Sequence, residues 1–177
     1  MNPQFPSTRD IVLIGGGHTH ALVLRRWGMN PLPGARLTLI NPHPTAPYTG
    51  MLPGFVAGHY DRDLLDIDLV RLARFAGARI VLGHATGIDR DAREITVEDR
   101  FLGPRRIGYD IASVDIGIHS RMSDLPGFDE NAVAAKPLDR FAEAWSAFRA
   151  DGAEGGMAVI GGGVGGVELA MAMSHGT

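Results

Sequence analysis

The chain has 177 residues, a formal net charge of −3 at pH 7 and no cysteine. Its length suits one domain, or one domain with a piece of another, and the charge gives no basic field, so we expect no nucleic-acid partner. The absence of cysteine excludes structural disulfides, Cys-based zinc sites and a redox cysteine pair within this span.

A glycine loop follows the first predicted strand, residues 11–14, and leads into a predicted helix over residues 18–27. The N–H groups at a helix start carry partial positive charge, which suits a pyrophosphate. In the G-x-G-x-x-G pattern, Gly15 permits the tight turn and Gly17 lets a phosphate approach the backbone. The third small position falls on His20, which predicts a displaced helix or an imidazole turned toward the pyrophosphate. Taken alone, this incomplete pattern is a weak signal.

The second predicted strand, residues 36–40, completes a βαβ unit whose short connections imply parallel, right-handed pairing. In dinucleotide-binding folds the residue that ends this strand usually carries a carboxylate for the ribose hydroxyls. Here it is Asn41, whose amide can donate or accept a hydrogen bond without a charge. Asn41 is therefore either a ribose contact or only the start of a turn before Pro42.

The middle of the chain alternates between irregular and regular segments. Residues 42–54 are rich in Pro and Gly, too irregular for a helix and too long for a simple turn, which is typical of a functional loop. A helix is predicted over residues 62–75, and a third strand over residues 78–86. Strand-like pieces at 94–97, 106–109 and 111–114 predict an inserted antiparallel meander, before a final strand that ends at 115–117.

A second strand, glycine turn and helix occupy residues 157–170, and here all three glycines are present. Two such units predict two nucleotide sites or one duplicated site. Before them, a helix should begin at Pro137, and its aromatic stripe (Phe141, Trp145 and Phe148) is typical of core packing. One strand and one helix cannot bury their own apolar faces, so we expect a fragment of a longer protein that self-associates.

The order of these motifs resembles the FAD-dependent pyridine nucleotide-disulfide oxidoreductase superfamily. Within it, the segments at residues 15–20 and 47–54 resemble NADH dehydrogenase-like flavoproteins, especially the modules joined to selenide-water dikinase. The resemblance covers nearly the whole chain. It implies a Rossmann-like FAD/NAD(P)-binding α/β fold, with residues 1–120 as the N-terminal part of the FAD-binding domain. Residues 121–177 would be a connector and the first βα unit of the NAD(P)H-binding domain.

The resemblance also implies contacts with FAD. The pyrophosphate would lie on the first loop, and the ribose of the adenosine would meet Asn41. Adenine would meet the backbone near Ala85, and a loop beside the flavin would meet the ring. Gly117 alone is kept from the family's Ala-Thr-Gly segment. The implied FAD-binding residues are Gly15, Gly17, His18, Thr19, His20, Asn41, Tyr48, Thr49, Gly50, Met51, Ala85 and Gly117.

The second glycine loop would open the NAD(P)H-binding domain through Gly161, Gly163 and Gly166. Glu168 matches a glutamate that lies near the nicotinamide and flavin in relatives. The alternative for Glu168 is an ordinary acid in the first helical turn, stabilised by the helix dipole.

The implied activity is a FAD-dependent NAD(P)H oxidoreductase that passes hydride from NAD(P)H to FAD and then to an acceptor such as a quinone. The flavin carries the chemistry, and no catalytic side chain is predicted. The incomplete first loop and the missing carboxylate favour an alternative, a non-catalytic dinucleotide-binding sensor or scaffold. Metal binding by His18 and His20 is disfavoured because two ligands are too few.

No apolar run approaches the roughly 20 residues needed to cross a bilayer, and the N-terminus lacks the charged start and apolar core of a secretory signal. We therefore expect a cytoplasmic protein and leave peripheral membrane contact open. Chemistry of the glutathione-reductase type is not expected, because the family's cysteine pair is absent from this span.

Overall fold

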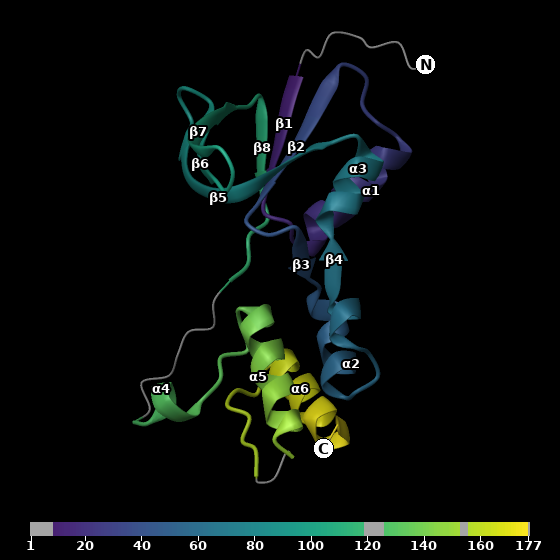
Figure 1. Ribbon diagram of the computed structural model, residues 1–177, viewed down its shortest axis with the longest axis vertical. Helices are drawn as coiled ribbons and strands as arrows, with labels where there is room; N and C mark the ends of the chain where they lie inside the picture. Colours follow the sequence, from purple (N-terminus) through teal and green to yellow (C-terminus); the bar gives the residue numbers. More distant parts are fainter. Residues whose placement is uncertain (1–8, 119–125, 153–155, 177) are drawn as a thin grey trace. The chain divides into compact units, whose positions relative to one another are not determined.

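The computed structural model describes residues 9–118, 126–152 and 156–176 (Figure 1). The chain divides into two compact units. The first comprises Met1–Ala46 and Ile67–Gly117, and the second comprises Pro47–Asp66 and Ile118–Thr177. The chain passes between the units through a two-stranded sheet of β3, Thr45–Pro47, and β4, Asp66–Asp68.

A six-stranded sheet organises the first unit (Figure 1). In the order in which they lie, its strands are β7 (Gly103–Gly108), β6 (Glu94–Asp99), β5 (Arg79–Asp89), β2 (Ala35–Asn41), β1 (Arg9–Ile14) and β8 (Ile111–Val114). The four strands β5, β2, β1 and β8 pair in parallel, whereas β5, β6 and β7 pair antiparallel. The predicted α/β fold with an antiparallel meander is therefore confirmed.

The prediction that residues 111–114 belong to the meander is wrong. These residues form β8, an edge strand parallel to β1, with Ile111 opposite Ile11. The reason is Asp110, which ends the meander. Its N–H donates to the carbonyl of Asp10 at 2.8 Å, and its carboxylate accepts the N–H of Asp10 at 2.7 Å. These bonds bring the chain to the start of β1.

The two faces of the parallel sheet are buried against different partners, because successive residues of a strand face opposite sides. Val12 lies in a core with Val97 of the meander. Leu13 lies in a separate core with residues of α1, His18–Met29, and α3, Leu69–Ala76. The unbroken apolar run in β1 therefore reflects burial on both faces.

The helix predicted over residues 62–75 is wrong over its first half. Residues Arg62–Leu65 form a 3-10 helix, η2, and β4 follows, so α3 begins only at Leu69. Asp68 caps α3, and its carboxylate accepts the N–H of Arg71 at 2.8 Å. Leu65 is buried in the core of the second unit and Leu69 in that of the first. The helical spacing of these leucines therefore does not reflect one continuous helix, because each leucine is buried in a different core.

The second unit is helical in its described part. Its elements are η1 (Thr49–Met51), α2 (Leu52–Val56), η2, α4 (Phe128–Asn131), α5 (Leu138–Ala150) and α6 (Val164–Gly176). Residues of α2, α5 and α6 share one core, which includes Val56 and Leu169. Phe141 and Trp145 are buried in it and Phe148 packs against it, so the predicted core role of the aromatic stripe is confirmed.

Two expectations for the second unit are wrong. Residues 52–54, predicted as loop, begin the helix α2, because Pro53 lies in the first turn, where its missing N–H costs no helical bond. Residues 157–160, predicted as a strand, have no strand conformation. Their backbone needs a neighbouring strand to pair with, and the described part of this unit offers none beside them.

Candidate functional site

The carboxyl ends of β1, β2 and β8 lie where the strand order reverses. β2 lies on one side of β1 and β8 on the other, and open α/β sheets bind ligands at such a reversal. The glycine loop follows β1, Asp115 follows β8, and Asn41 is the last residue of β2. Residues from three distant parts of the sequence therefore meet in one site.

Gly15 turns the chain out of β1 with φ +93°, a conformation that favours glycine. A Cβ here would collide with the main-chain carbonyl of Asp115. The N–H of Gly15 donates to the carbonyl of Ile40 at 2.8 Å. Gly15 therefore shapes the loop, while its N–H is committed to β2.

Asn41 fastens the loop from the end of β2. Its Oδ1 accepts the N–H of Gly16 at 2.8 Å, and its Nδ2 donates to the carbonyl of His43 at 2.7 Å. This fastening role was missed from the sequence, although a short polar residue at a strand end beside a glycine loop is a usable signal. The ribose contact stays a prediction. It would use the second hydrogen on Nδ2, since the bond to His43 uses only one.

The helix α1 begins without a capping side chain of its own, because its N-cap residue is Gly17 and its first turn has no acid. Asp115 supplies the missing group from the end of β8. Its Oδ2 accepts the N–H of His20 at 3.2 Å. His20 is the third helical residue, whose N–H an N-cap oxygen normally accepts. The resemblance had assigned a contact only to Gly117 in this segment, so Asp115 is an additional residue of the site.

The imidazole of His20 is buried, with 2% of the residue exposed. Its Nδ1 lies 2.7 Å from the carbonyl oxygen of Gly15, and its Nε2 lies 2.9 Å from the Ser113 hydroxyl. A carbonyl can only accept, so Nδ1 carries a hydrogen, and in the neutral ring Nε2 then accepts from the Ser113 hydroxyl. The ring thus ties the loop to β8, which contradicts the expectation of an imidazole turned toward a pyrophosphate.

The outer side of the loop is formed by the next residues. Gly17 is half-buried, and His18 and Thr19 are exposed. The first N–H groups of a helix have no partner within it. Residues 17–20 thus form the start of α1, the positive end of the helix, and their contact with a pyrophosphate stays a prediction.

Two further predicted contacts lie in the first unit. Ala85 is half-buried in β5 opposite Val97, beside a register shift between Ala85 and Gly87. Gly117 is exposed, and a Cβ built there has no described neighbour within 4 Å. Their contacts with adenine and flavin stay predictions.

The predicted flavin loop belongs to the second unit. Tyr48 is 38% exposed and precedes η1, which contains Thr49, Gly50 and Met51. A Cβ on Gly50 would lie 2.7 Å from Cζ of Tyr48. Glycine here therefore allows the tyrosine ring to fold over the turn.

The second glycine loop forms a tight entry to α6. Gly161 has φ +124°, and a Cβ on Gly166 would collide with the carbonyl oxygen of Gly161. The N–H of Val167 donates to the carbonyl of Gly163 at 3.1 Å. Glu168 is exposed and is the fifth residue of α6, outside its first turn. The alternative of a first-turn acid is therefore wrong.

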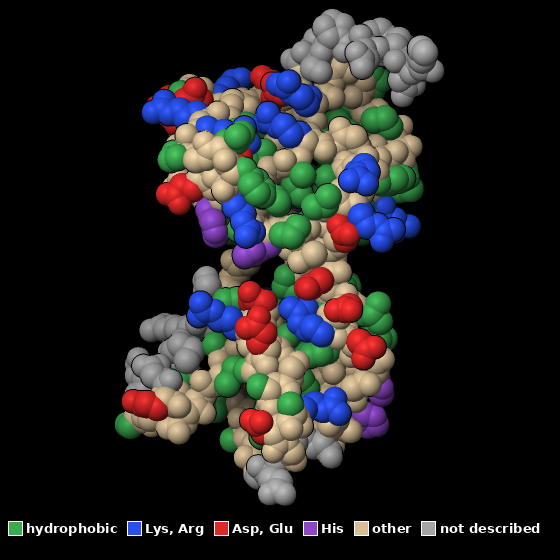
Figure 2. Space-filling view, in the orientation of Figure 1, with side chains coloured by type: hydrophobic (Ala, Val, Ile, Leu, Met, Phe, Trp, Pro, Cys, Tyr) green, Lys and Arg blue, Asp and Glu red, His purple; other side chains and the backbone are tan. Residues whose placement is uncertain are grey.

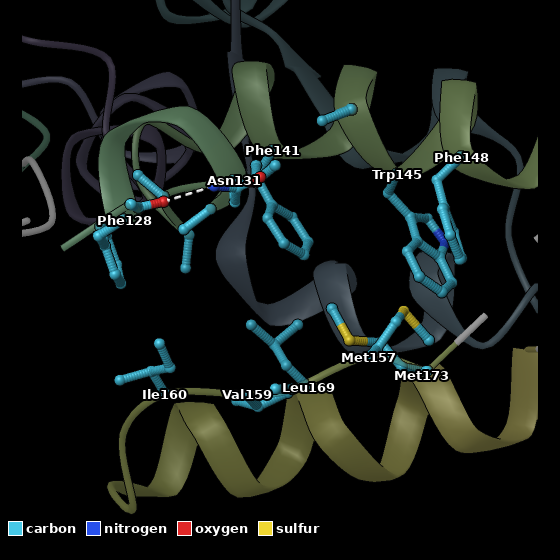
Figure 3. Close-up of a pocket in the computed structure, with 18 of the residues that line it drawn as sticks. Phe128, Asn131, Phe141, Trp145, Phe148, Met157, Val159, Ile160, Leu169 and Met173 are labelled. Atoms are coloured by element: carbon cyan, nitrogen blue, oxygen red, sulfur yellow. Dashed lines mark hydrogen bonds between the residues drawn. The ribbon is translucent and has the colours of Figure 1, made fainter. Parts of the chain in front are cut away.

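A cavity of about 710 Å³ lies in the second unit (Figure 3). Phe141 and Trp145 of α5 line it opposite Leu169 and Met173 of α6. Most of its lining is apolar, and the glycines of the second loop are not part of it. The cavity therefore does not suit the phosphates of a dinucleotide.

Charges on the surface are mixed in sign. On the face shown in Figure 2, acidic and basic side chains are interspersed over each unit. This face therefore has no extended field of one sign. Among the described residues, no helix is long and apolar enough to cross a bilayer.

The strand order and the glycine loop after β1 define a Rossmann-like fold. A model of the family described as pyridine nucleotide-disulphide oxidoreductase matches residues 9–176. The chain belongs to this family. It is 28% identical over 167 residues to the NADH dehydrogenase-like protein YutJ of Bacillus subtilis (strain 168), a match that covers 92% of this chain and 44% of YutJ. The chain thus spans less than half the length of that relative.

Solved structures support the same fold. The reduced Bacillus anthracis CoADR-RHD is similar with a TM-score of 0.80 at 20% identity, over 97% of this chain and 32% of that chain. The water-forming NADH oxidase from Lactobacillus brevis, bound to NADH, has a TM-score of 0.73 at 20% identity, over 95% and 38%. These similarities establish the Rossmann-like architecture.

Proposed function

We propose that the protein containing this chain is a FAD-dependent NAD(P)H oxidoreductase of the NADH dehydrogenase-like kind. The observation that carries the proposal is the first loop, where the start of α1, with His18 and Thr19 exposed, lies at the reversal of strand order. Membership of the family and the similarity to YutJ support FAD and NAD(P)H as the two cofactors.

The residues of the first loop fit a pyrophosphate, because its glycines leave no side chain between ligand and backbone. We assign the pyrophosphate of FAD to the backbone at the start of α1, residues 17–20. We also assign Asn41 to the ribose, Ala85 to adenine, and Gly117 with the loop at Tyr48 to the flavin. When bound, FAD would accept hydride from NAD(P)H and pass electrons to an acceptor such as a quinone.

The second loop would serve NAD(P)H. Gly166 lies so close to the carbonyl oxygen of Gly161 that there is no room for a side chain at position 166, and a phosphate would meet the glycine backbone at the start of α6. The carbonyl of Gly163 accepts the first hydrogen bond of the helix. We place Glu168 near the nicotinamide and flavin. Its exposure leaves the carboxylate accessible to a ligand.

A non-catalytic dinucleotide-binding sensor or scaffold is the second candidate. The features that favour it are His20 at the third small position of the first loop and Asn41 in place of the usual carboxylate at the end of β2. This candidate predicts dinucleotide binding without turnover.

Flavin reduction tests the proposal. The full-length protein, loaded with FAD, is mixed with NADH or NADPH without oxygen, and the absorbance of the oxidised flavin is followed. We expect bleaching with at least one nucleotide. Tight FAD binding with no bleaching by either nucleotide would instead support the scaffold.

A matched pair of glycine variants tests whether the second loop binds NAD(P)H. In Gly166→Ala the new Cβ meets the carbonyl of Gly161, whereas Gly165→Ala adds a Cβ with no described neighbour within 4 Å. We expect Gly166→Ala to slow bleaching at least tenfold while FAD stays bound, and Gly165→Ala to leave the rate unchanged. Equal rates in both variants would contradict the role of this loop.

We further propose that the protein works in the cytoplasm, where NAD(P)H is supplied, and that it self-associates. Exposed apolar side chains of α6, such as Val164 at 77% and Met171 at 70%, support self-association. Cell fractionation tests the location, and recovery of the protein only with membranes would contradict it.

A further inference from the structure

An acidic side chain lies at the start of α1, where the proposed function places a pyrophosphate. Oδ2 of Asp115 accepts the N–H of His20 at 3.2 Å. The same carboxylate lies against Gly17, where a Cβ would be 2.5 Å from Oδ2 and 2.7 Å from Cγ. The N–H groups at a helix start favour an anion, and here a protein anion already lies among them.

Strand pairing fixes the place of this carboxylate. β8 pairs with β1 up to Val114, which lies opposite Ile14. The N–H of Asp115 then donates to the carbonyl of Ile14 at 2.8 Å, and the carbonyl of Asp115 lies against Gly15. While β1 and β8 stay paired, the backbone of Asp115 is held in place, and the carboxylate moves by rotation of the side chain.

The groups around Asp115 explain why a charge is held there. The first turn of α1 contains no acid and its N-cap is a glycine, so the N–H of His20 needs an acceptor from elsewhere. The imidazole of His20 does not compete, because its nitrogens bond to Gly15 and Ser113. The Asp115 carboxylate thus caps the start of α1, although it comes from the segment after β8 and not from the residue before the helix.

We propose that Asp115 sets the affinity of the site, because its carboxylate and the pyrophosphate of the dinucleotide compete for the N–H groups at the start of α1. The inference rests on the proposed function, since it takes the first loop as the pyrophosphate site. Like charges a few ångströms apart repel. Binding of the pyrophosphate therefore requires the carboxylate to leave the His20 N–H or to stay at an electrostatic cost, whereas a flavin without phosphate meets no such competitor.

Removal of this one charge tests the proposal. Asp115→Asn removes the charge and keeps an oxygen for the His20 N–H, since Asn is as good an N-cap as Asp. The matched control is Asp91→Asn, which makes the same change of charge in the exposed turn between β5 and β6. Each purified variant is titrated calorimetrically with FAD, with ADP, and with riboflavin, which has no phosphate.

We expect Asp115→Asn to lower the Kd for FAD and ADP about tenfold, equivalent to about 1.4 kcal/mol, and to leave riboflavin binding unchanged. Asp91→Asn should leave all three unchanged. Circular dichroism verifies that the variants are folded. If Asp115→Asn does not fold, Asp115→Ser, which is also neutral and keeps an N-cap oxygen, takes its place.

Unchanged or weaker binding of FAD and ADP by folded Asp115→Asn would overturn the proposal, and so would an equal gain in Asp91→Asn. The test also separates the proposed function from the role of Asp115. If no variant binds FAD but ADP binds more tightly to Asp115→Asn, the FAD-dependent function fails and the competition stands. If neither FAD nor ADP binds any variant, both fail.

Discussion

At the scale of single residues, the first loop depends on a buried histidine. The family pattern has a small residue at position 20, which lets the helix and strand pack closely. Here the imidazole occupies that space and bonds to Gly15 on one side and Ser113 on the other. His20 thus replaces close packing with two hydrogen bonds, and it joins the loop to the strand that carries Asp115.

Replacement of His20 by Ala should destabilise the protein by about 2–4 kcal/mol, because it removes two buried hydrogen bonds and leaves a cavity. Chemical denaturation followed by circular dichroism measures the change. His84→Ala, in an exposed position of β5, is the control and should cost less than about 0.5 kcal/mol. Equal stability of the two variants would mean that the imidazole bonds contribute nothing.

The sequence predicted the glycine loop but not the partners of its side chains. The roles of Gly15 and Gly17 can be predicted from a local pattern, since a tight turn between a strand and a helix needs glycine at these positions. The bond from His20 to Asp115 joins positions 95 residues apart. Local periodicity has no information about such pairs, so Asp115 could be identified only once β8 was placed beside β1.

At the scale of elements, local signals worked where one core buries the whole element. The prediction for α1 began at its observed first residue, His18, because a glycine turn and a single apolar face define it. The prediction of one helix over residues 62–75 failed, because Leu65 and Leu69 are helically spaced but lie in different cores. The strand predicted at residues 157–160 failed because pairing partners cannot be read from one segment.

The start of α3 is set by Asp68. Asp68→Ala should lower the free energy of unfolding by about 1 kcal/mol, because the N–H of Arg71 loses its acceptor. Thermal and urea unfolding measure this loss. Asp63→Ala, at an exposed position in η2, is the matched control with little expected effect. A loss that is the same in both variants would show that Asp68 contributes only its charge.

At the scale of the whole molecule, the chain alternates between two units. It begins in the first, enters the second at Pro47, returns at Ile67 and leaves again after Gly117. The family resemblance implies a single boundary near residue 120. The segment 47–66 groups with the second unit through Leu65 and other buried apolar residues, and this long-range packing leaves no local mark.

Self-association should depend on α6. Val164, Val167 and Met171 are 77%, 51% and 70% exposed, and their spacing places them on one face of the helix. Sedimentation velocity should show association of the purified chain that decreases when Val164 and Met171 are replaced by Ser. The control is Leu22→Ser, a change of an exposed apolar residue of α1. A monomer at all concentrations would contradict the prediction.

The pairing of β8 with β1 has a consequence for chain entropy. Closing a loop costs roughly 0.6 kcal/mol for each doubling of its length. The hairpin of β5 and β6 joins Asp89 to Glu94, five positions away, whereas the bond between His20 and Asp115 spans 95 positions. Closing the longer loop therefore costs about 2.5 kcal/mol more. Fraying of β8 regains the backbone entropy of its own residues and removes Asp115 from α1, so the affinity of the cofactor loop is coupled to the stability of an edge strand.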